Sequence, residues 1–383
     1  QDASLINGPM LLLRSIRGFS SNRSMLWLAT VPAALFGLGL FNLSAHATEL
    51  PELNAAFLAN NLWLLIATIL VIFMNAGFAM VEAGMCRSKN AVNILAKNLF
   101  VFALAVTAYW FIGFSIMYGG SVAGGWLFFS GLFFDPTVTA DMVTNGALVP
   151  TVDFLFQSAF AGTAATIVSG LVAERVKFGE FVLFALVLTG FIYPVSGSWQ
   201  WNSDGWLGGI GFIDFAGSSI VHSVGAWAGL VGAMLLGPRI GKFVSGSPQA
   251  MPGHNMAIAT LGALILWIGW YGFNPGSELA MDQYVAYVAV TTTLAAAGGA
   301  IAATVFSTIT SGKPDLTMII NGILAGLVSI TAGCGNMTFV GSWLAGAFMG
   351  RLRAPSASTK THPWKSEKQT STSFGSLPST LSP

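Results

Sequence analysis

Residues 58–82 read LANNLWLLIATILVIFMNAGFAMVE. A helix that crosses a bilayer needs about 20 mostly apolar residues, and this stretch is long enough to do so. Arg87 and Lys89 follow it closely, and basic residues of this kind are typical of the cytoplasmic end of a span. The stretch therefore predicts a membrane-spanning helix, and the remainder of the chain repeats the pattern.

The composition of the chain agrees with a membrane protein. Of its 383 residues, 54% are hydrophobic and only 8% are charged, whereas soluble domains carry about 25% charged residues. The 16 basic and 15 acidic residues nearly cancel, which leaves no basic surface for nucleic acid. Two cysteines, Cys86 and Cys334, cannot build a zinc ribbon or a disulfide framework. These observations exclude a soluble enzyme, a nucleic-acid-binding module and a secreted disulfide scaffold.

Nine apolar segments follow residue 48. They lie near residues 58–82, 98–119, 152–173, 179–195, 213–236, 256–275, 285–310, 316–333 and 338–350. The last segment is too short to span a bilayer alone. The predicted fold is an all-α, polytopic membrane helical bundle.

The basic residues predict how this bundle is oriented. Between residues 24 and 350 they fall in alternate connections: Arg87, Lys89 and Lys97; Arg175 and Lys177; Arg239 and Lys242; and Lys313. Basic loops are retained in the cytoplasm. We therefore expect a multi-pass protein of the inner or plasma membrane with the N-terminus of the mature chain outside.

The N-terminal region has the order of a secretory signal peptide. Residues 1–24, which we leave unassigned, contain Arg14, Arg17 and Arg23, and an apolar run then leads to Ala45-His46-Ala47. A basic region, an apolar stretch and an A-x-A site indicate a signal peptide over residues 25–47, cleaved after Ala47. The alternative is an uncleaved first span.

Two apolar strings suggest an internal repeat. Residues 69–78 (ILVIFMNAGF) and 264–273 (LILWIGWYGF) both run into a Gly-Phe pair. The first would start outside and the second inside, so the pair would be inverted, as is common in transporters. Chance similarity between apolar segments is the alternative.

His222 lies inside a predicted span, in the string IVHSVG. An intramembrane imidazole can exchange a proton or hydrogen-bond a polar substrate, although a helix–helix hydrogen bond is the alternative. Asp214 lies eight residues earlier, so we expect it to share a helix face with His222 and to cap the helix. Gly225 and Gly229 form G-x-x-x-G, which predicts close helix packing.

Aromatic residues gather towards the predicted outer side. Trp199, Trp201 and Trp206 are expected in an extracellular loop, and Phe160 and Phe273 within spans. Such residues are either membrane anchors or a cation–π site. The sequence contains no nucleotide or metal motif, so we expect no cofactor, no metal site and no enzymatic activity.

Several of these strings resemble the Amt/Mep/Rh family of ammonium transporters. Residues 214–218, continuing through His222 and the two glycines to 237–239, are similar to the signature segment of the family. Similar strings recur at residues 84–90, at Phe160 with 173–175, and at 269–274. The resemblance covers about residues 60–350 and favours the Amt branch.

The resemblance implies a homotrimer whose subunits each have eleven spans, two inverted five-helix halves and their own pore for ammonium or ammonia. It also implies roles for individual residues. The outer recruitment site would comprise Trp201, Phe156 and Ser277 with Asp214 as its support, the gate would be Phe160 and Phe273, and His222 and Trp270 would line the pore.

The C-terminal part departs from the family. The second pore histidine, expected in an Asp-Asp-Pro…His-Gly context, is absent, and residues 351–383 are polar and predicted to be disordered. We expect the transporter domain at residues 48–350 and a frameshift or sequence error near codon 350, with a genuinely truncated product as the alternative. Docking of a PII signalling protein cannot be assumed with this tail. An ammonium sensor or an inactive fragment are therefore alternative functions.

Overall fold

The computed structural model of the chain describes residues 53–352. The signal peptide predicted at 25–47 and nearly all of the tail predicted at 351–383 lie outside these residues, so both stay predictions. The helices are α3 (Ala55–Met85), α4 (Ala91–Ala108), α5 (Phe114–Tyr118), α6 (Ala140–Thr144), α7 (Pro150–Leu171), α8 (Phe178–Val187), α9 (Tyr193–Trp201), α10 (Trp206–Gly209), α11 (Val224–Leu236), α12 (Met256–Phe273), α13 (Gln283–Ser311), α14 (Leu316–Ile330) and α15 (Phe339–Leu352).

Short irregular turns and two small hairpins complete the described part. The 3₁₀ turns are η1 (Ser88–Asn90) and η5 (Pro275–Glu278), and the π-helical turns are η2 (Tyr109–Gly113), η3 (Leu188–Ile192) and η4 (Ser218–Ser223). The strands β1 (Ser121–Ala123) and β2 (Leu127–Phe128) form one antiparallel pair, and β3 (Phe243–Val244) and β4 (Ser247–Pro248) form the other.

The prediction of an all-α membrane bundle is confirmed. Within residues 53–352, seven helical segments are long and apolar enough to cross a bilayer, and α14 is a shorter apolar helix. With α15, they coincide with the nine segments predicted from the sequence. Two boundaries were wrong: the second segment begins at residue 91 with α4 and not near residue 98, and the fourth does not end near residue 195 but continues through η3 and α9. Trp199 and Trp201 therefore lie on α9 and Trp206 on α10, not in a loop.

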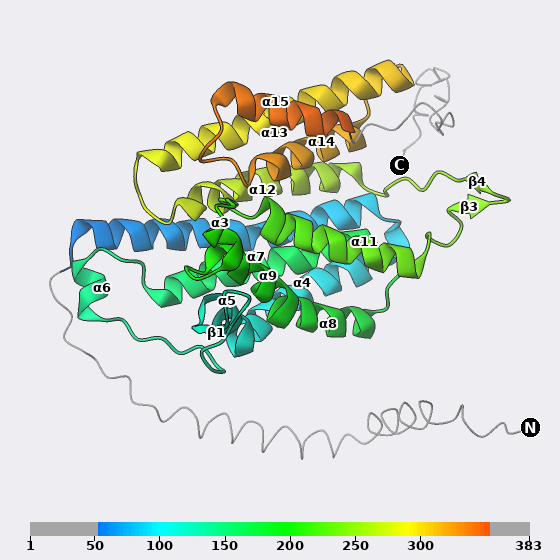
Figure 1. The fold of residues 1–383 in the computed structure, drawn as a ribbon. Helices are drawn as coiled ribbons and strands as arrows, with labels where there is room; N and C mark the ends of the chain where they lie inside the picture. Colours follow the sequence, from blue (N-terminus) through cyan, green and yellow to red (C-terminus); the bar gives the residue numbers. More distant parts are fainter. Residues whose placement is uncertain (1–52, 353–383) are drawn as a thin grey trace, which may run out of the picture. The chain divides into compact units, whose positions relative to one another are not determined.

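Helices α3 and α12 pack side by side and run in opposite directions (Figure 1). Gly262 of α12 faces Gly77 of α3, where an added Cβ would lie 2.6 Å from the Gly77 carbonyl oxygen, and Gly272 faces Ala67 at the other end. Glycine permits this close approach because it has no side chain. The two strings that suggested an inverted repeat thus lie on adjacent antiparallel helices.

The position predicted for Lys97 was wrong. The sequence placed it in a basic loop with Arg87 and Lys89, but it lies within α4 and is only 1% exposed. Its Nζ is 5.4 Å from the centroid of the Phe181 ring. The other basic residues used for the orientation remain in connections between the long helices, so they still alternate between loops.

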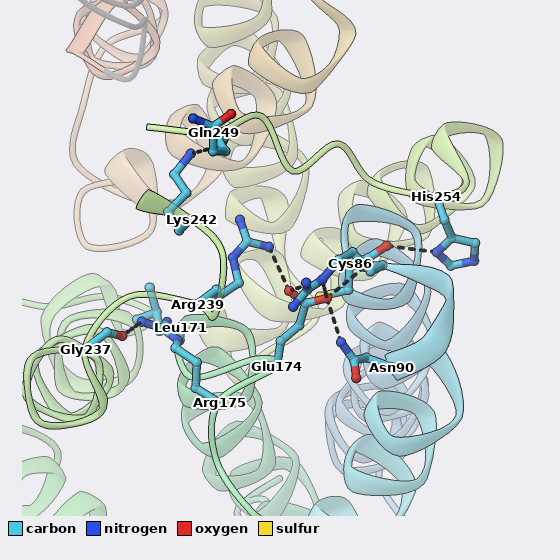
Figure 2. Close-up of polar contacts among 11 residues, drawn as sticks. Cys86, Asn90, Leu171, Glu174, Arg175, Gly237, Arg239, Lys242, Gln249 and His254 are labelled. Atoms are coloured by element: carbon cyan, nitrogen blue, oxygen red, sulfur yellow. Dashed lines mark hydrogen bonds and ion pairs between the residues drawn. The ribbon is translucent and has the colours of Figure 1, made fainter. Parts of the chain in front are cut away.

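The carboxylate of Glu174 contacts three connections between helices at the predicted cytoplasmic end of the bundle (Figure 2). The side chain of Glu174 is fully buried. It accepts hydrogen bonds from the backbone N–H of Arg87 at 2.9 Å, from Arg87 Nε at 3.1 Å, from Asn90 Nδ2 at 2.8 Å and from Arg239 Nη1 at 3.1 Å. The connections after α3, α7 and α11 are therefore held in one arrangement.

The ionised form of Glu174 is strongly favoured. Burial alone would raise its pKa, but the hydrogen bonds from Arg87, Asn90 and Arg239 outweigh burial and lower the pKa from 4.5 to about 2. Because the folded-state pKa lies below the unfolded value, the stabilisation is present above pH 4.5 and is lost as the pH falls towards 2.

Replacing Glu174 should therefore destabilise the protein markedly. We expect Glu174→Ala to lower the free energy of unfolding in detergent by about 3 kcal/mol, because two arginines lose a buried partner. Glu180→Ala removes an exposed pair with Lys177 and should cost less than about 1 kcal/mol. The difference between wild type and Glu174→Ala should be constant from pH 8 to about 5. Equal costs for the two variants would contradict this interpretation.

Candidate functional site

A cavity of about 290 Å³ opens at the predicted outer end of the bundle. Its lining residues come from the helices and turns around α7, α9 and η5. They are Tyr118, Leu148, Pro150, Asp153, Phe156, Gln157, Phe160, Trp201, Phe215, Ser277 and Leu279. The structure thus brings Phe156, Phe160, Trp201 and Ser277 together, as the resemblance implied, whereas Asp214 is not among the lining residues.

Two stacked phenyl rings lie beneath this cavity. The ring centroids of Phe160 and Phe273 are 3.9 Å apart with 15° between the planes, and both side chains are buried. Phe156 lies one helical turn from Phe160 on α7, with its ring centroid 4.5 Å away. The ring of Trp201 meets Phe160 edge-on at 6.1 Å. Aromatic faces and edges therefore form the floor and one wall of the cavity.

Trp201 is held in place by the backbone of Asp214. The indole Nε1 donates a hydrogen bond to the Asp214 carbonyl oxygen at 2.9 Å. The side chain of Ser277 donates to the Phe273 carbonyl oxygen at 2.8 Å, so the hydroxyl oxygen can act as an acceptor towards the cavity. The polar groups of Trp201 and Ser277 are thus each oriented by a backbone carbonyl.

The carboxylate of Asp214 caps a helix, but its predicted position on that helix was wrong. Asp214 precedes the first helical residue, Ser218, and does not share a helix face with His222. Its two oxygens accept hydrogen bonds of 2.7–3.0 Å from four backbone N–H groups, those of residues 217, 218, 219 and 220. Gly217 has φ 108°, a conformation that glycine adopts readily and that lets the chain turn around the carboxylate.

His222 and Trp270 lie on the inner side of the phenyl pair. The His222 ring is 5.3 Å from Phe273 and 5.1 Å from Trp270, with which it stacks at 18°. Trp270 is fixed by a hydrogen bond of 3.0 Å from its Nε1 to Thr331 Oγ1. His222 is 4% exposed, and its Nε2 has no hydrogen-bond partner within residues 53–352. A buried imidazole nitrogen without a partner among these residues therefore lies beneath the phenyl pair.

The glycine pair after His222 packs as predicted. Gly225 and Gly229 lie against α7, where Cβ atoms would meet the Ala164 carbonyl oxygen and the Leu171 side chain. This close packing sets the distance between the helix that carries His222 and the helix that carries Phe160.

Sequence reasoning missed two polar residues of the cavity, Asp153 and Gln157. Asp153 lies three residues before Phe156 and seven before Phe160, on the same face of α7. An acidic residue within a predicted span is itself a signal, because ionisable groups are rare there.

Within the described part of the chain, no three His, Cys, Asp or Glu side chains cluster as metal ligands would.

Loss of the Asp214 carboxylate should unfold the start of this helix. We expect Asp214→Ala to lower the free energy of unfolding by about 2 kcal/mol or more, because four backbone donors lose their acceptor. Asp282→Ala is the matched control, since Asp282 caps α13 through a single hydrogen bond, to Tyr284 N, and should cost about 1 kcal/mol. Thermal unfolding in detergent measures both, and an equal loss would mean that the fourfold cap is unimportant.

The chain is similar to the members of a known protein family. The profile of the Ammonium Transporter Family matches residues 62–362. A Synechocystis protein named as an ammonium transporter is 46% identical, with 83% of this chain and 71% of that protein covered. Ammonium transporter Amt2 of Archaeoglobus fulgidus is 45% identical, with 75% of this chain and 61% of that relative covered.

Solved structures show the same similarity. The structure named Sensor Amt Protein has a TM-score of 0.73 at 36% identity, covering 78% of this chain and 74% of that one. Mep2 of Saccharomyces cerevisiae has a TM-score of 0.70 at 28% identity, covering 78% of this chain and 66% of that one.

Proposed function

Since the chain belongs to the ammonium transporter family, we propose that it carries ammonium nitrogen across the membrane. The proposed path runs from the outer cavity past Phe160 and Phe273 to His222. The observation that carries this proposal is the stacked phenyl pair, which separates a cavity lined by aromatic and polar groups from a buried histidine. Similar proteins of Synechocystis and Archaeoglobus fulgidus are named as ammonium transporters.

In this proposal the outer cavity recruits the ammonium ion. A small cation is attracted by the π faces of Phe156 and Trp201, an interaction worth about 0.5–2 kcal/mol depending on desolvation. The Ser277 hydroxyl oxygen offers an acceptor for one N–H. Asp214 supports the site indirectly, because its carbonyl oxygen orients the Trp201 indole.

The phenyl pair then discriminates against cations. A charge at the bilayer centre costs at least about 2.5–3.5 kcal/mol, and the two buried rings leave it no hydrogen-bonding groups. Ammonium can avoid this cost by losing a proton, so that neutral ammonia passes the apolar section. A potassium ion has no proton to lose and meets the full barrier.

His222 receives the proton in this scheme. One N–H bond of ammonium breaks, the proton joins an imidazole nitrogen of His222, and ammonia continues inward. The unpartnered Nε2 supports this role, because a buried imidazole nitrogen without a hydrogen bond is costly to the empty protein and gains a partner when the substrate arrives. Trp270 stacks on the imidazole and holds its plane.

The proposal also includes the setting of the transporter. The chain is a multi-pass membrane protein. We place it in the inner or plasma membrane as a homotrimer, with the mature N-terminus outside and with no cofactor or enzymatic step. Regulation by a PII signalling protein is not part of the proposal.

An ammonium sensor is the second candidate function. The similarity to the structure named Sensor Amt Protein favours it, because binding alone would need the outer cavity but not conduction. Saturable uptake by the purified chain would decide for a transporter. Binding without uptake would decide for a sensor, and failure to enter membranes would indicate an inactive fragment.

Uptake by a histidine variant tests the proposed path. We expect His222→Ala to reduce methylammonium uptake into proteoliposomes to the level of empty liposomes, because no group remains to accept the proton. His254→Ala is the control, since His254 lies in the connection before α12 and contacts Cys86, and its uptake should stay within about twofold of wild type. Unchanged uptake by His222→Ala would contradict the proton-transfer role.

A further inference from the structure

The outer cavity holds one acidic side chain that makes no hydrogen bond or ion pair with the described residues. Asp153 lines the cavity from the first turn of α7 and is half-buried. No described residue donates a hydrogen bond to its carboxylate and none forms an ion pair with it. A partly desolvated carboxylate without a partner is unfavourable in the empty protein.

Other acidic residues of the bundle are engaged differently. The carboxylate of Asp214 is surrounded by four backbone N–H groups, and that of Glu174 by two arginines and Asn90. Asp282 caps a helix. Asp153 lies in the first turn of α7, where a helix N-terminus favours an acidic side chain, but it neither caps α7 nor pairs with a base among the described residues.

Gln157 is a second unpartnered group on the same wall. It is 6% exposed, it lines the cavity, and its Oε1 has no hydrogen-bond partner within the described residues. Gln157 follows Asp153 by four residues on α7, so the two side chains lie on neighbouring turns of one helix face. Asp153 and Gln157 thus line one wall of a cavity whose other walls are mainly aromatic.

We propose that Asp153 and Gln157 form a polar half of the cation site in this cavity, opposite in character to the aromatic half of Phe156 and Trp201. The ionised form of Asp153 supplies a negative charge that the π faces lack, and the Gln157 amide is the second polar group on the same wall. The ligand is a small monovalent cation with N–H donors, such as ammonium or methylammonium. This inference rests on the proposed transport function and assigns it two further specificity-determining residues.

The consequence is measurable as affinity. In this proposal Asp153 contributes to binding of the cation in the outer cavity, before the cation reaches the phenyl pair. Loss of its charge should therefore raise KM and leave the maximal rate within about twofold of wild type. One pair of unit charges about 4 Å apart in water corresponds to about a fivefold change in affinity. Added salt screens this attraction. The KM of the wild type should therefore rise with ionic strength, while that of the neutral variant should hardly change.

The test is methylammonium uptake by the full chain in proteoliposomes at low and high sodium chloride. We expect Asp153→Asn to raise KM about fivefold or more at low salt, Asp153→Glu to keep it near wild type, and Gln157→Leu to raise it by a smaller factor. Asp204→Asn is the control, because Asp204 is an exposed acid at the same end of the bundle. Asp153→Ser replaces Asp153→Asn should the amide variant fail to fold.

The outcomes separate the two proposals. A wild type without uptake overturns the proposed transport function. A wild type that transports, together with an unchanged KM in the neutral Asp153 variant, overturns this inference alone. An equal rise of KM in Asp204→Asn would also overturn it, because the effect would then be one of general surface charge.

Discussion

The contact between the rings of Phe160 and Phe273 is the constraint on which the other features depend. At 3.9 Å between centroids, the two rings leave no room for a hydrated ion between the cavity and His222. One ring comes from α7 and the other from the end of α12, so the gate exists only while these two helices keep their spacing. Glycines allow each of these helices to pack closely on a neighbour, α12 on α3 and α7 on α11. The packing of small residues thus supports the positions of both rings.

The polar groups are arranged around this apolar barrier. On the outer side, Asp214 organises the backbone before η4, and its carbonyl oxygen positions Trp201. On the inner side, Glu174 holds three connections together. In both places the carboxylate is satisfied by several donors and serves the fold. Asp153, Gln157 Oε1 and His222 Nε2 lack such partners among the described residues, and all three lie along the proposed path.

The sequence predicted the segments well because each one is a long apolar run, and the periodic alternation with basic loops is a strong signal. The family strings also brought Phe156, Phe160, Trp201 and Ser277 to one cavity correctly. The sequence could not predict that α9 continues the fourth span, since Ser, Gly and Pro in residues 194–198 resemble a loop. It also misplaced Lys97, whose long aliphatic stem lets it lie inside α4. Asp153 was missed although an acidic residue in a predicted span is a signal; only the fold shows that it lines the same cavity as Trp201 and Ser277.

The central claim is that cations stop at the phenyl pair while ammonium nitrogen passes. The most direct measurement compares ammonium and potassium flux through the purified chain in the same proteoliposomes, under equal concentration gradients. The account predicts saturable ammonium flux and a potassium flux no greater than that of empty liposomes. A potassium flux comparable to the ammonium flux would contradict it, because the rings would then be passing an intact cation.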